Sequence, residues 1–189
     1  KVNIVVVDKT GTITKGKPTL VDIQNLSNLK DDELVSILAS LEKKSEHPIA
    51  HAIVNYAHEK NISVPDISGF EGIQGKGLQG IINGTEYFAG NAKLVSDLEL
   101  PFDSTKLNEF TSQGKTPVIL ATKEKVLGFV MVADEIKQES KQAVADLHKL
   151  GIKVVMLTGD DEKAAKYIAS LVGIDDVVAH VLPQDKLEK

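Results

Sequence analysis

The sequence predicts an α/β protein in which an α+β domain with an antiparallel sheet is inserted into a parallel-sheet domain. Two wholly apolar runs, residues 2–7 and 152–157, show no alternation and are typical of strands buried on both faces of a parallel sheet. From Asp134 onward, helix and strand patterns alternate, which indicates βαβ units. Between the runs, residues 65–89 are rich in glycine and contain Asn83-Gly84, a strong hairpin signal.

Spacing and end signals predict the first elements. Apolar residues recur at helical spacing after Asp31 and Asp32, two acids that suit the positive end of a helix dipole. Pro48 has the fixed φ of a first helical turn and predicts the start of another helix. The elements expected in this part are strands at 2–7 and 19–23 and helices at 31–44 and 48–58.

Short apolar runs between turn residues predict the strands that follow, and alternating patterns predict the last four elements. In order, these are strands at 67–70, 78–82 and 86–88, a helix at 105–113, a hairpin of strands at 117–121 and 126–132, a helix at 137–150, a strand at 152–157, a helix at 161–172 and a strand at 177–181. We therefore expect a discontinuous domain at 1–22 and 133–189 and an inserted domain at 23–132.

Composition excludes several classes of function. The 22 basic and 27 acidic residues give a net charge of -5 without any basic block, so we expect no nucleic-acid partner. The absence of cysteine excludes disulfides and thiolate metal sites. No apolar run reaches the roughly 18 residues of a membrane helix, so this chain is expected to be soluble and not inserted in a membrane. It begins inside a strand and ends directly after a motif, which we interpret as a fragment of a longer protein.

The residues that carry chemistry follow two predicted strands. Asp8 ends one strand and Thr158-Gly159-Asp160 follows another, and the carboxyl ends of parallel strands meet at one edge of a sheet. A single Asp after a strand is often only a turn or cap residue. The complete run Asp8-Lys9-Thr10-Gly11-Thr12, however, resembles the phosphorylation motif of P-type ATPases, which belong to the haloacid-dehalogenase-like superfamily.

This resemblance implies a catalytic role for Asp8, Lys9, Thr10 and Thr12. Asp8 would attack the γ-phosphoryl group of ATP and become an aspartyl phosphate. Simple phosphatases of the superfamily carry a second acid two residues after the nucleophile, and here Thr10 occupies that position. The resemblance therefore implies a long-lived phosphoenzyme.

Three further stretches resemble motifs of the family in the expected order: Asp134-Glu135-Ile136-Lys137, Thr158-Gly159-Asp160 and Pro183-Gln184-Asp185-Lys186. The resemblance implies that Thr158, with Gly159 and Asp160, holds a phosphoryl oxygen and that Lys186 neutralises charge on the phosphoryl group. Asp134 and Lys137 match the acid and base at the return from the inserted domain, and we assign them to the nucleotide site.

The inserted domain carries Ser45-Glu46-His47-Pro48, which resembles the nucleotide-domain motif of the heavy-metal branch of these ATPases. The resemblance implies that Glu46 faces the adenine amino group and that His47 orients the nucleotide. From the residues alone, His47 and Pro48 could simply begin a helix.

Two glycine-containing pairs favour the nucleotide interpretation. Gly75 and Gly77 resemble the family's Gly-x-Gly near the phosphates, where a Cβ would block the approach, and Gly90-Asn91 resembles the pair near the ribose and phosphates. The stretch from Gly75 to Gly80 also fits G-x-G-x-x-G, but a hairpin signal follows it instead of a helix, which excludes a dinucleotide fingerprint.

The expected cofactors are ATP and Mg²⁺. By resemblance, the carboxylate of Asp8 and the carbonyl of Thr10 bind Mg²⁺, together with an acid from a Gly-Asp-Gly-x-x-Asn-Asp segment that this sequence lacks. Asp161 replaces the Asn usual after Thr-Gly-Asp and adds a negative charge near the site. We therefore expect ATP binding but weak or absent autophosphorylation.

The sequence thus predicts the cytosolic ATP-binding and phosphorylation part of an ATPase that exports a heavy metal, with copper or silver expected before zinc, cadmium or cobalt. Its expected partners are the actuator and transmembrane domains of the parent transporter, on the cytoplasmic side of a membrane. Two alternatives stay open: a separate phosphatase of the same superfamily, and a non-catalytic module that binds nucleotide or metal.

Overall fold

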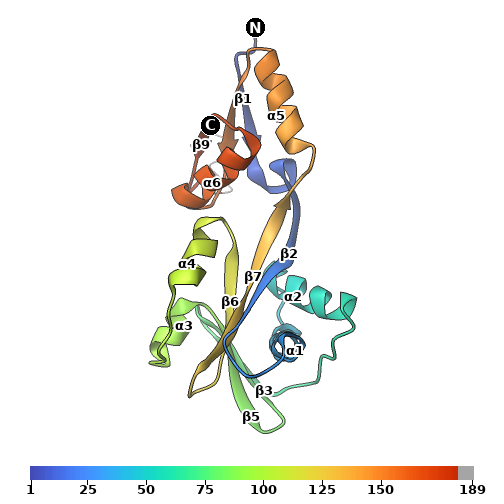
Figure 1. Ribbon diagram of the computed structural model, residues 1–189, viewed down its shortest axis with the longest axis vertical. Coiled ribbons are helices and arrows are strands. Elements are labelled where there is room, and N and C mark those ends of the chain that lie inside the picture. Colours follow the sequence, from blue (N-terminus) through green and yellow to red (C-terminus); the bar gives the residue numbers. More distant parts are fainter. Residues whose placement is uncertain (183–189) are drawn as a thin grey trace. The chain divides into compact units, whose positions relative to one another are not determined.

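The computed structural model describes residues 1–182, and the chain divides into two compact units (Figure 1). Unit 1 contains Lys1–Lys17, Asn108–Lys115 and the chain from Asp134 onward, and unit 2 contains Pro18–Leu107 and Thr116–Ala133. Each unit has its own hydrophobic core. The structure confirms the predicted class, an α/β fold with one parallel and one antiparallel sheet.

Unit 1 is built on a parallel sheet in the order β1-β8-β9. These strands are Ile4–Asp8, Lys153–Leu157 and Asp176–Val178. Helices α5 (Ser140–Lys149) and α6 (Glu162–Val172) pack on the sheet face that carries Val154 and Met156. The buried residues of this core are Ile13, Val144, Val154, Met156, Ala165, Ala169, Val172 and Ile174.

The prediction that the first strand is buried on both faces is wrong for the described part of the chain. Val2, Ile4 and Val6 are 64%, 55% and 47% exposed. Within residues 1–182, β1 is the edge strand of its sheet, and both helices cover the face that Val7 shares with the core. One face of β1 therefore stays open to solvent.

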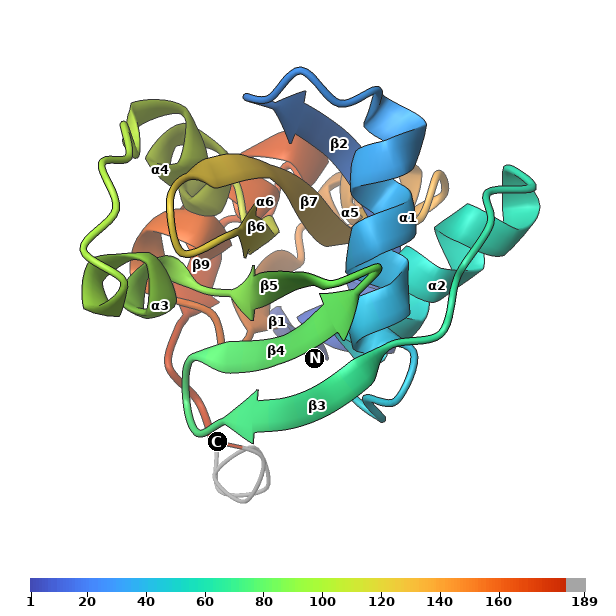
Figure 2. The same cartoon turned by 90° about the horizontal axis from the view of Figure 1, so that it is seen from below.

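The antiparallel sheet has the order β2-β7-β6-β5-β4-β3. Its strands are Thr14–Asn25, Val126–Ile136, Thr116–Ala121, Thr85–Gly90, Gly77–Ile82 and Ser68–Ile73. Figure 2 shows β3, β4 and β5 side by side, as their antiparallel register requires. Strands β2 and β7, which are neighbours in this sheet, extend beyond the predicted ranges 19–23 and 126–132.

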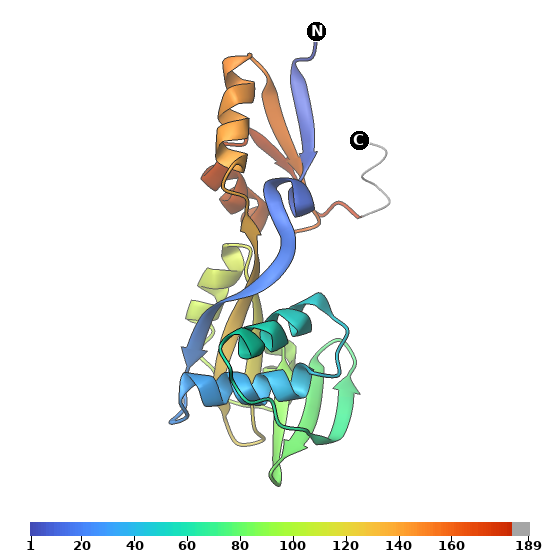
Figure 3. The same cartoon turned by 90° about the vertical axis from the view of Figure 1, so that its right-hand side faces the viewer.

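Helices α1 (Asp31–Glu42) and α2 (Pro48–Glu59) begin where the sequence predicts. They lie together on one face of the antiparallel sheet (Figure 3). The core between them and the sheet includes Leu34, Val35, Leu38, Leu41, Ile53, Leu78, Leu120 and Val130. Burial of these side chains is the main force that holds the unit together.

The Asn83-Gly84 hairpin is confirmed. Both residues have positive φ, 49° and 81°, and they join Ile82 to Thr85 across the β4–β5 turn. This is the pattern of a type I′ turn, whose twist matches that of the strands.

Of the helices α3 and α4, the sequence predicted only one. Helix α4 (Thr105–Ser112) matches its prediction, but α3 (Ala92–Asp97) was not predicted, because a helix of six residues is too short to show a periodic apolar pattern. Within residues 1–182, no helix is both long and apolar enough to cross a membrane.

Candidate functional site

The parallel sheet of unit 1 brings the two predicted acidic loops together. The register pairs Asp8, the last residue of β1, with Leu157, and Thr158 follows Leu157 directly. Asp8 is half-buried, whereas Thr10 and Thr12 in the following loop are exposed. Lys186, the remaining predicted catalytic residue, lies outside the described residues.

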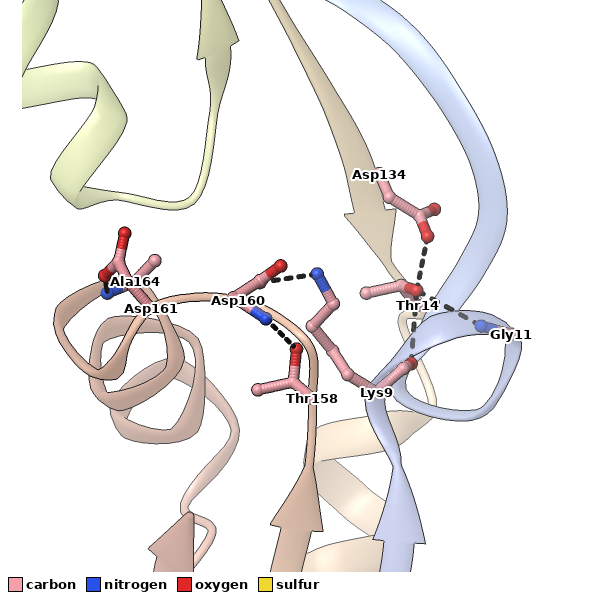
Figure 4. A network of polar contacts seen from close by, with 8 residues as sticks. All are labelled: Lys9, Gly11, Thr14, Asp134, Thr158, Asp160, Asp161 and Ala164. Carbon is pink, nitrogen blue, oxygen red and sulfur yellow. Dashed lines mark hydrogen bonds and ion pairs between the residues drawn. The ribbon is translucent and has the colours of Figure 1, made fainter. Parts of the chain in front are cut away.

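An ion pair links the two loops (Figure 4). The Nζ of Lys9 lies 2.7 Å from Oδ2 of Asp160, and the Lys9 side chain is only 14% exposed. The buried Thr158 hydroxyl accepts a hydrogen bond from the backbone N–H of Asp160 at 3.1 Å. Gly159, between them, is exposed. The Lys9–Asp160 ion pair therefore joins the loop after β1 to the loop after β8.

Thr14, which sequence reasoning missed, is the buried anchor of the loop after Asp8 (Figure 4). Its hydroxyl lies 2.6 Å from Oδ2 of Asp134 and 3.2 Å from the carbonyl oxygen of Lys9, and it accepts from the N–H of Gly11 at 3.3 Å. Gly11 has φ of 78°, a conformation that favours glycine. No local signal separated Thr14 from the other threonines of the loop, because its partner is 120 residues away.

Asp134 and Lys137, predicted for the nucleotide site, contact this same loop. Besides Thr14, Asp134 accepts a hydrogen bond from the backbone N–H of Gly16 at 2.9 Å. The Nζ of Lys137 donates to the carbonyl oxygen of Gly11 at 2.9 Å, and its backbone N–H donates to that of Ile13 at 3.0 Å. Through these hydrogen bonds, the side chains of Asp134 and Lys137 connect the segment that follows unit 2 in the sequence with the loop after Asp8.

Asp161 has a structural function at the start of α6. Its carboxylate accepts a hydrogen bond from the N–H of Ala164 at 2.8 Å and so caps the first turn of α6 (Figure 4). Asp and Asn are about equally good at this position, so the fold accommodates either residue.

The oxygen donors expected for Mg²⁺ fit that ion only in part. Mg²⁺ prefers oxygen ligands and commonly binds through one or two carboxylates, water and substrate phosphate. Asp8 and the Thr10 carbonyl, near the end of β1, are donors of that kind. Among residues 1–182, however, no group of three or more His, Asp or Glu side chains is placed to hold a metal ion, and Asp160 is paired with Lys9.

Unit 2 contains a cavity of about 430 Å³ between α1, α2 and the strands β4 and β5. Five of the predicted nucleotide-site residues line it: His47, Gly75, Gly77, Gly90 and Asn91. The other lining residues are Glu42, Ser45, Ile49, Ala50, Ile73, Lys76, Leu78, Ala89, Pro117 and Val118. The wall therefore combines apolar surface with a few polar groups, as is typical of small-molecule sites.

The glycines of this cavity have two different reasons to be glycine. A Cβ on Gly77 would lie 2.0 Å from the carbonyl oxygen of Ala89, and one on Gly90 would lie 2.0 Å from that of Lys76. These two glycines are needed because two backbones pack against each other. Gly75 instead has φ of 71° and open space where a Cβ would point, so its backbone is accessible to a ligand.

Asn91 and His47 are both fixed by helix caps. Asn91 accepts from the N–H of Leu94 through Oδ1 and donates through Nδ2 to the carbonyl oxygen of Gly75, at 3.2 and 3.0 Å. Nδ1 of His47 accepts from the N–H of Ile49 at 3.2 Å, which leaves Nε2 as the nitrogen available to a ligand.

Glu42, which sequence reasoning missed, is the carboxyl group that lines the cavity, whereas Glu46 is not among the lining residues. Glu42 is 9% exposed, and burial raises the pKa of its carboxyl to about 7. It is the last residue of α1, and no local pattern distinguishes it from a solvated acid at a helix end, because the segments that cover it come from elsewhere in unit 2.

A second cavity of about 520 Å³ lies elsewhere in unit 2, between the first half of α1, the segment after α2 and the β4–β5 hairpin. None of the predicted site residues lines it. We therefore place the candidate nucleotide site in the smaller cavity, where the polar groups converge.

Known proteins resemble the chain over its whole length. The family model described as haloacid dehalogenase-like hydrolase matches residues 2–189. A copper-exporting P-type ATPase of Staphylococcus saprophyticus subsp. saprophyticus is 42% identical over 191 residues, covering 100% of this chain and 23% of the relative. A probable cadmium-transporting ATPase of Staphylococcus aureus is 43% identical over 190 residues, covering 96% of this chain and 24% of the relative.

A solved structure agrees with these relatives. The crystal structure of a zinc-transporting PIB-type ATPase in the E2.Pi state has a TM-score of 0.87 and 32% sequence identity, and the match covers 100% of this chain and 30% of that one. The chain thus spans about a quarter of the length of these two curated relatives. The chain belongs to the haloacid dehalogenase-like hydrolase family, and the three relatives named above are P-type ATPases named for copper, cadmium and zinc.

Proposed function

We propose that the chain is the ATP-binding and phosphorylation part of a P-type ATPase that exports a heavy-metal cation. Unit 2 would be the nucleotide-binding domain and unit 1 the phosphorylation domain. The observation that supports this proposal best is the cavity of unit 2, where His47, Gly75, Gly77, Gly90 and Asn91 converge from separate stretches of the sequence.

The lining of the cavity supports a separate part in nucleotide binding for Glu42, for His47 and for the Gly75–Lys76 segment. Glu42 takes the role at the base that the resemblance had assigned to Glu46, because Glu42 is the carboxyl group in the wall. His47 presents Nε2 to the nucleotide, since Nδ1 is occupied by the helix cap. The accessible backbone at Gly75 and the ammonium of Lys76 suit the negatively charged phosphates.

Phosphoryl transfer would then occur at Asp8. A carboxylate oxygen of Asp8 attacks the γ-phosphorus, the bond to the oxygen that bridges the β- and γ-phosphates breaks, and ADP leaves. Thr10, in the position of the second acid of phosphatases, cannot protonate a leaving group as a carboxylic acid does, which favours a stable phosphoenzyme over rapid hydrolysis. Mg²⁺, held by Asp8 and the Thr10 carbonyl, would supply charge neutralisation at the phosphoryl oxygens.

Nucleotide binding is tested by titrating ATP while the amide signals of unit 2 are followed by NMR. We expect the signals of His47, Gly75 and Gly77 to shift and His47→Ala to weaken binding by about tenfold or more, the loss of one good polar contact. His51→Ala is the matched control, because His51 is exposed on the same helix and does not line the cavity. An unchanged spectrum at saturating ATP contradicts the proposal.

Phosphorylation is tested with γ-labelled ATP and Mg²⁺. We expect at most a weak acid-stable, hydroxylamine-sensitive label, which accumulates slowly in the wild type and is absent in Asp8→Asn. Asp146→Asn, an exposed acid on α5, should label like the wild type. Labelling that persists in Asp8→Asn would show that another residue accepts the phosphoryl group.

Copper or silver is the transported ion that we propose first. The copper and cadmium relatives have nearly the same identity, 42% and 43%, so similarity over this chain separates heavy-metal transport from other functions but not one metal from another. Uptake of Cu⁺, Ag⁺, Cd²⁺ and Zn²⁺ into membrane vesicles that contain the full-length transporter decides between them.

A further inference from the structure

The cavity of about 520 Å³ in unit 2 shares no lining residue with the candidate nucleotide site. It involves the opposite end of α1, because Asp32 and Glu33 at the start of the helix line it, whereas Glu42 at the end lines the smaller cavity. Its volume falls in the range of sites for small organic molecules, about 300–1,000 Å³. The larger cavity is therefore a separate candidate site.

The inner wall of this cavity is apolar. Ile82 is 6% exposed, and the half-buried side chains of Leu29, Ile37, Ile62 and Tyr87 pack with one side against the core of unit 2. Part of their apolar surface stays accessible from the cavity. A ligand with an apolar body would remove that surface from water, which favours binding.

The outer wall of the cavity is polar and acidic. Its exposed residues are Asp32, Glu33, Asn61, Ser63, Asn83 and Thr85, and no Lys, Arg or His is among the described lining residues. Within residues 1–182, the carboxylates of Asp32 and Glu33 have no hydrogen bond or ion pair. Acids in a first helical turn stabilise the helix through its dipole, but that function does not require an apolar cavity beside them.

The walls of the cavity are held together without a ligand. The hydroxyl of Ser36, on α1, donates to the carbonyl oxygen of Ser63 at 2.6 Å, which joins the helix to the segment after α2. The third wall is the β4–β5 hairpin, whose turn at Asn83-Gly84 has the conformation of a type I′ turn. A preformed site loses little conformational entropy when a ligand binds.

We propose that this cavity binds an organic ammonium ion. The apolar body of the ligand lies against Ile37, Ile62 and Tyr87, and its ammonium group lies at Asp32 and Glu33, which attract a cation and repel an anion. A metal ion fits less well, because among residues 1–182 no group of three or more His, Asp or Glu side chains is placed to hold one. This inference does not depend on the proposed nucleotide site.

Tryptamine is the probe for this experiment, because it joins an apolar indole ring to an ammonium group. We would titrate it into the 189-residue chain and follow the amide signals by NMR. The signals of Ser36, Ile62 and Asn83 should shift while those of Gly75 and Gly77 stay in place. The dissociation constant expected for so small a ligand is about 1 mM or lower.

Two analogues of tryptamine isolate the contribution of its charge. Tryptophol carries a neutral hydroxyl in place of the ammonium group and should bind about fivefold more weakly, the upper end for an exposed ion pair. Indole-3-propionate carries a carboxylate there and should bind more weakly still. This order should become less pronounced at high salt, because exposed charges are screened.

Two double variants test the role of the acids. Asp32→Asn/Glu33→Gln should bind tryptamine as weakly as tryptophol and leave tryptophol binding unchanged. Asp31→Asn/Glu59→Gln removes two charges from exposed acids of α1 and α2 that do not line the cavity, so it should keep the preference for tryptamine. A thermal melt establishes that each variant is folded, and the three probes on the wild type decide by themselves if the first variant does not fold.

Several results would overturn the inference. These are no shift at the highest soluble concentration of tryptamine, shifts at Gly75 and Gly77 instead, equal binding of the three probes, or a preference for tryptamine that survives in Asp32→Asn/Glu33→Gln. If the cavity signals shift when the protein alone is diluted, a second copy of the chain occupies the cavity and the inference is wrong. Failure of ATP to bind would overturn the proposed function and leave this inference standing.

Discussion

Glu42 illustrates how a single buried acid couples the stability of unit 2 to pH. Its pKa is raised by burial from 4.5 to about 7, so the folded protein holds a proton that the unfolded chain releases between these values. A group with a raised folded pKa contributes stability that is complete below the unfolded pKa and is lost as the pH rises through the folded pKa. Above neutral pH, the ionised carboxylate of Glu42 therefore destabilises the folded protein.

We predict that unit 2 unfolds more easily at pH 8 than at pH 5 because of this residue. The rise of the pKa from 4.5 to about 7 converts to about 3 kcal/mol. Urea unfolding of the wild type and of Glu42→Gln at several pH values measures this loss of stability. The difference in the free energy of unfolding between the two proteins should grow as the pH rises through about 7. A difference that is the same at all pH values contradicts the prediction.

Gly77 shows a residue whose identity is set by backbone packing. We predict that Gly77→Ala destabilises the protein by about 1–3 kcal/mol, the usual cost of overpacking, because its Cβ would lie 2.0 Å from the Ala89 carbonyl oxygen. ATP binding should weaken as the cavity wall shifts. Gly72→Ala is the control: it lies in the neighbouring strand with nothing within 4 Å of its Cβ, so thermal melting should be nearly unchanged. Equal melting temperatures for the two variants would overturn the packing explanation.

At the scale of elements, the start of β2 and the end of β7 are joined near the loop after Asp8 by side chains as well as by backbone. Asp134, on β7, accepts from the Thr14 hydroxyl and the Gly16 N–H, both on β2. This arrangement fixes where the chain leaves unit 1 and where it returns. It also gives Asp134 a structural function in addition to the nucleotide contact that the resemblance implies.

We predict that Asp134→Ala lowers the free energy of unfolding by about 1–3 kcal/mol, because two donors lose a charged acceptor. Urea unfolding measures this change, and calorimetry with ATP measures the dissociation constant. Glu135→Ala, which removes only an exposed pair with Lys15, should cost about 0–1 kcal/mol. A variant that unfolds like the wild type but binds ATP more weakly would show that Asp134 acts on the nucleotide directly.

At the scale of the whole molecule, the chain has two cores that share no residue. The larger core belongs to unit 2, and the ends of that unit, near Pro18 and Ala133, lie on the paired strands β2 and β7. A segment whose ends are neighbours in one sheet can be excised with little disturbance of its packing.

We therefore predict that residues 18–133, which comprise unit 2 and the Asn108–Lys115 segment of unit 1, fold as an isolated domain and bind ATP with the affinity of the full chain. Circular dichroism and calorimetry on this segment test the prediction. Loss of the folded state on excision would show that unit 2 depends on unit 1 for its stability.

Some features of this protein could be predicted from its sequence and others could not, and the difference has a physical reason. Asn83-Gly84 was predicted correctly because the positive φ of a two-residue turn depends on local chemistry alone. The helix after Pro48 was predicted for the same reason. Glu42 and Thr14 were missed because each is defined by burial, which arises from segments distant in the sequence.

The sequence by itself determined the order of most helices and strands, the class of fold and the run Asp8-Lys9-Thr10-Gly11-Thr12 that indicates the family, because these depend on patterns within a few residues. The tertiary structure alone decided which groups meet. The register of β1 against β8 places Asp8 beside the Thr158 loop, and the packing of α1 on the sheet buries the carboxyl of Glu42 in the cavity wall. Register and packing join residues that are far apart in the chain, and a local pattern holds no information about such contacts.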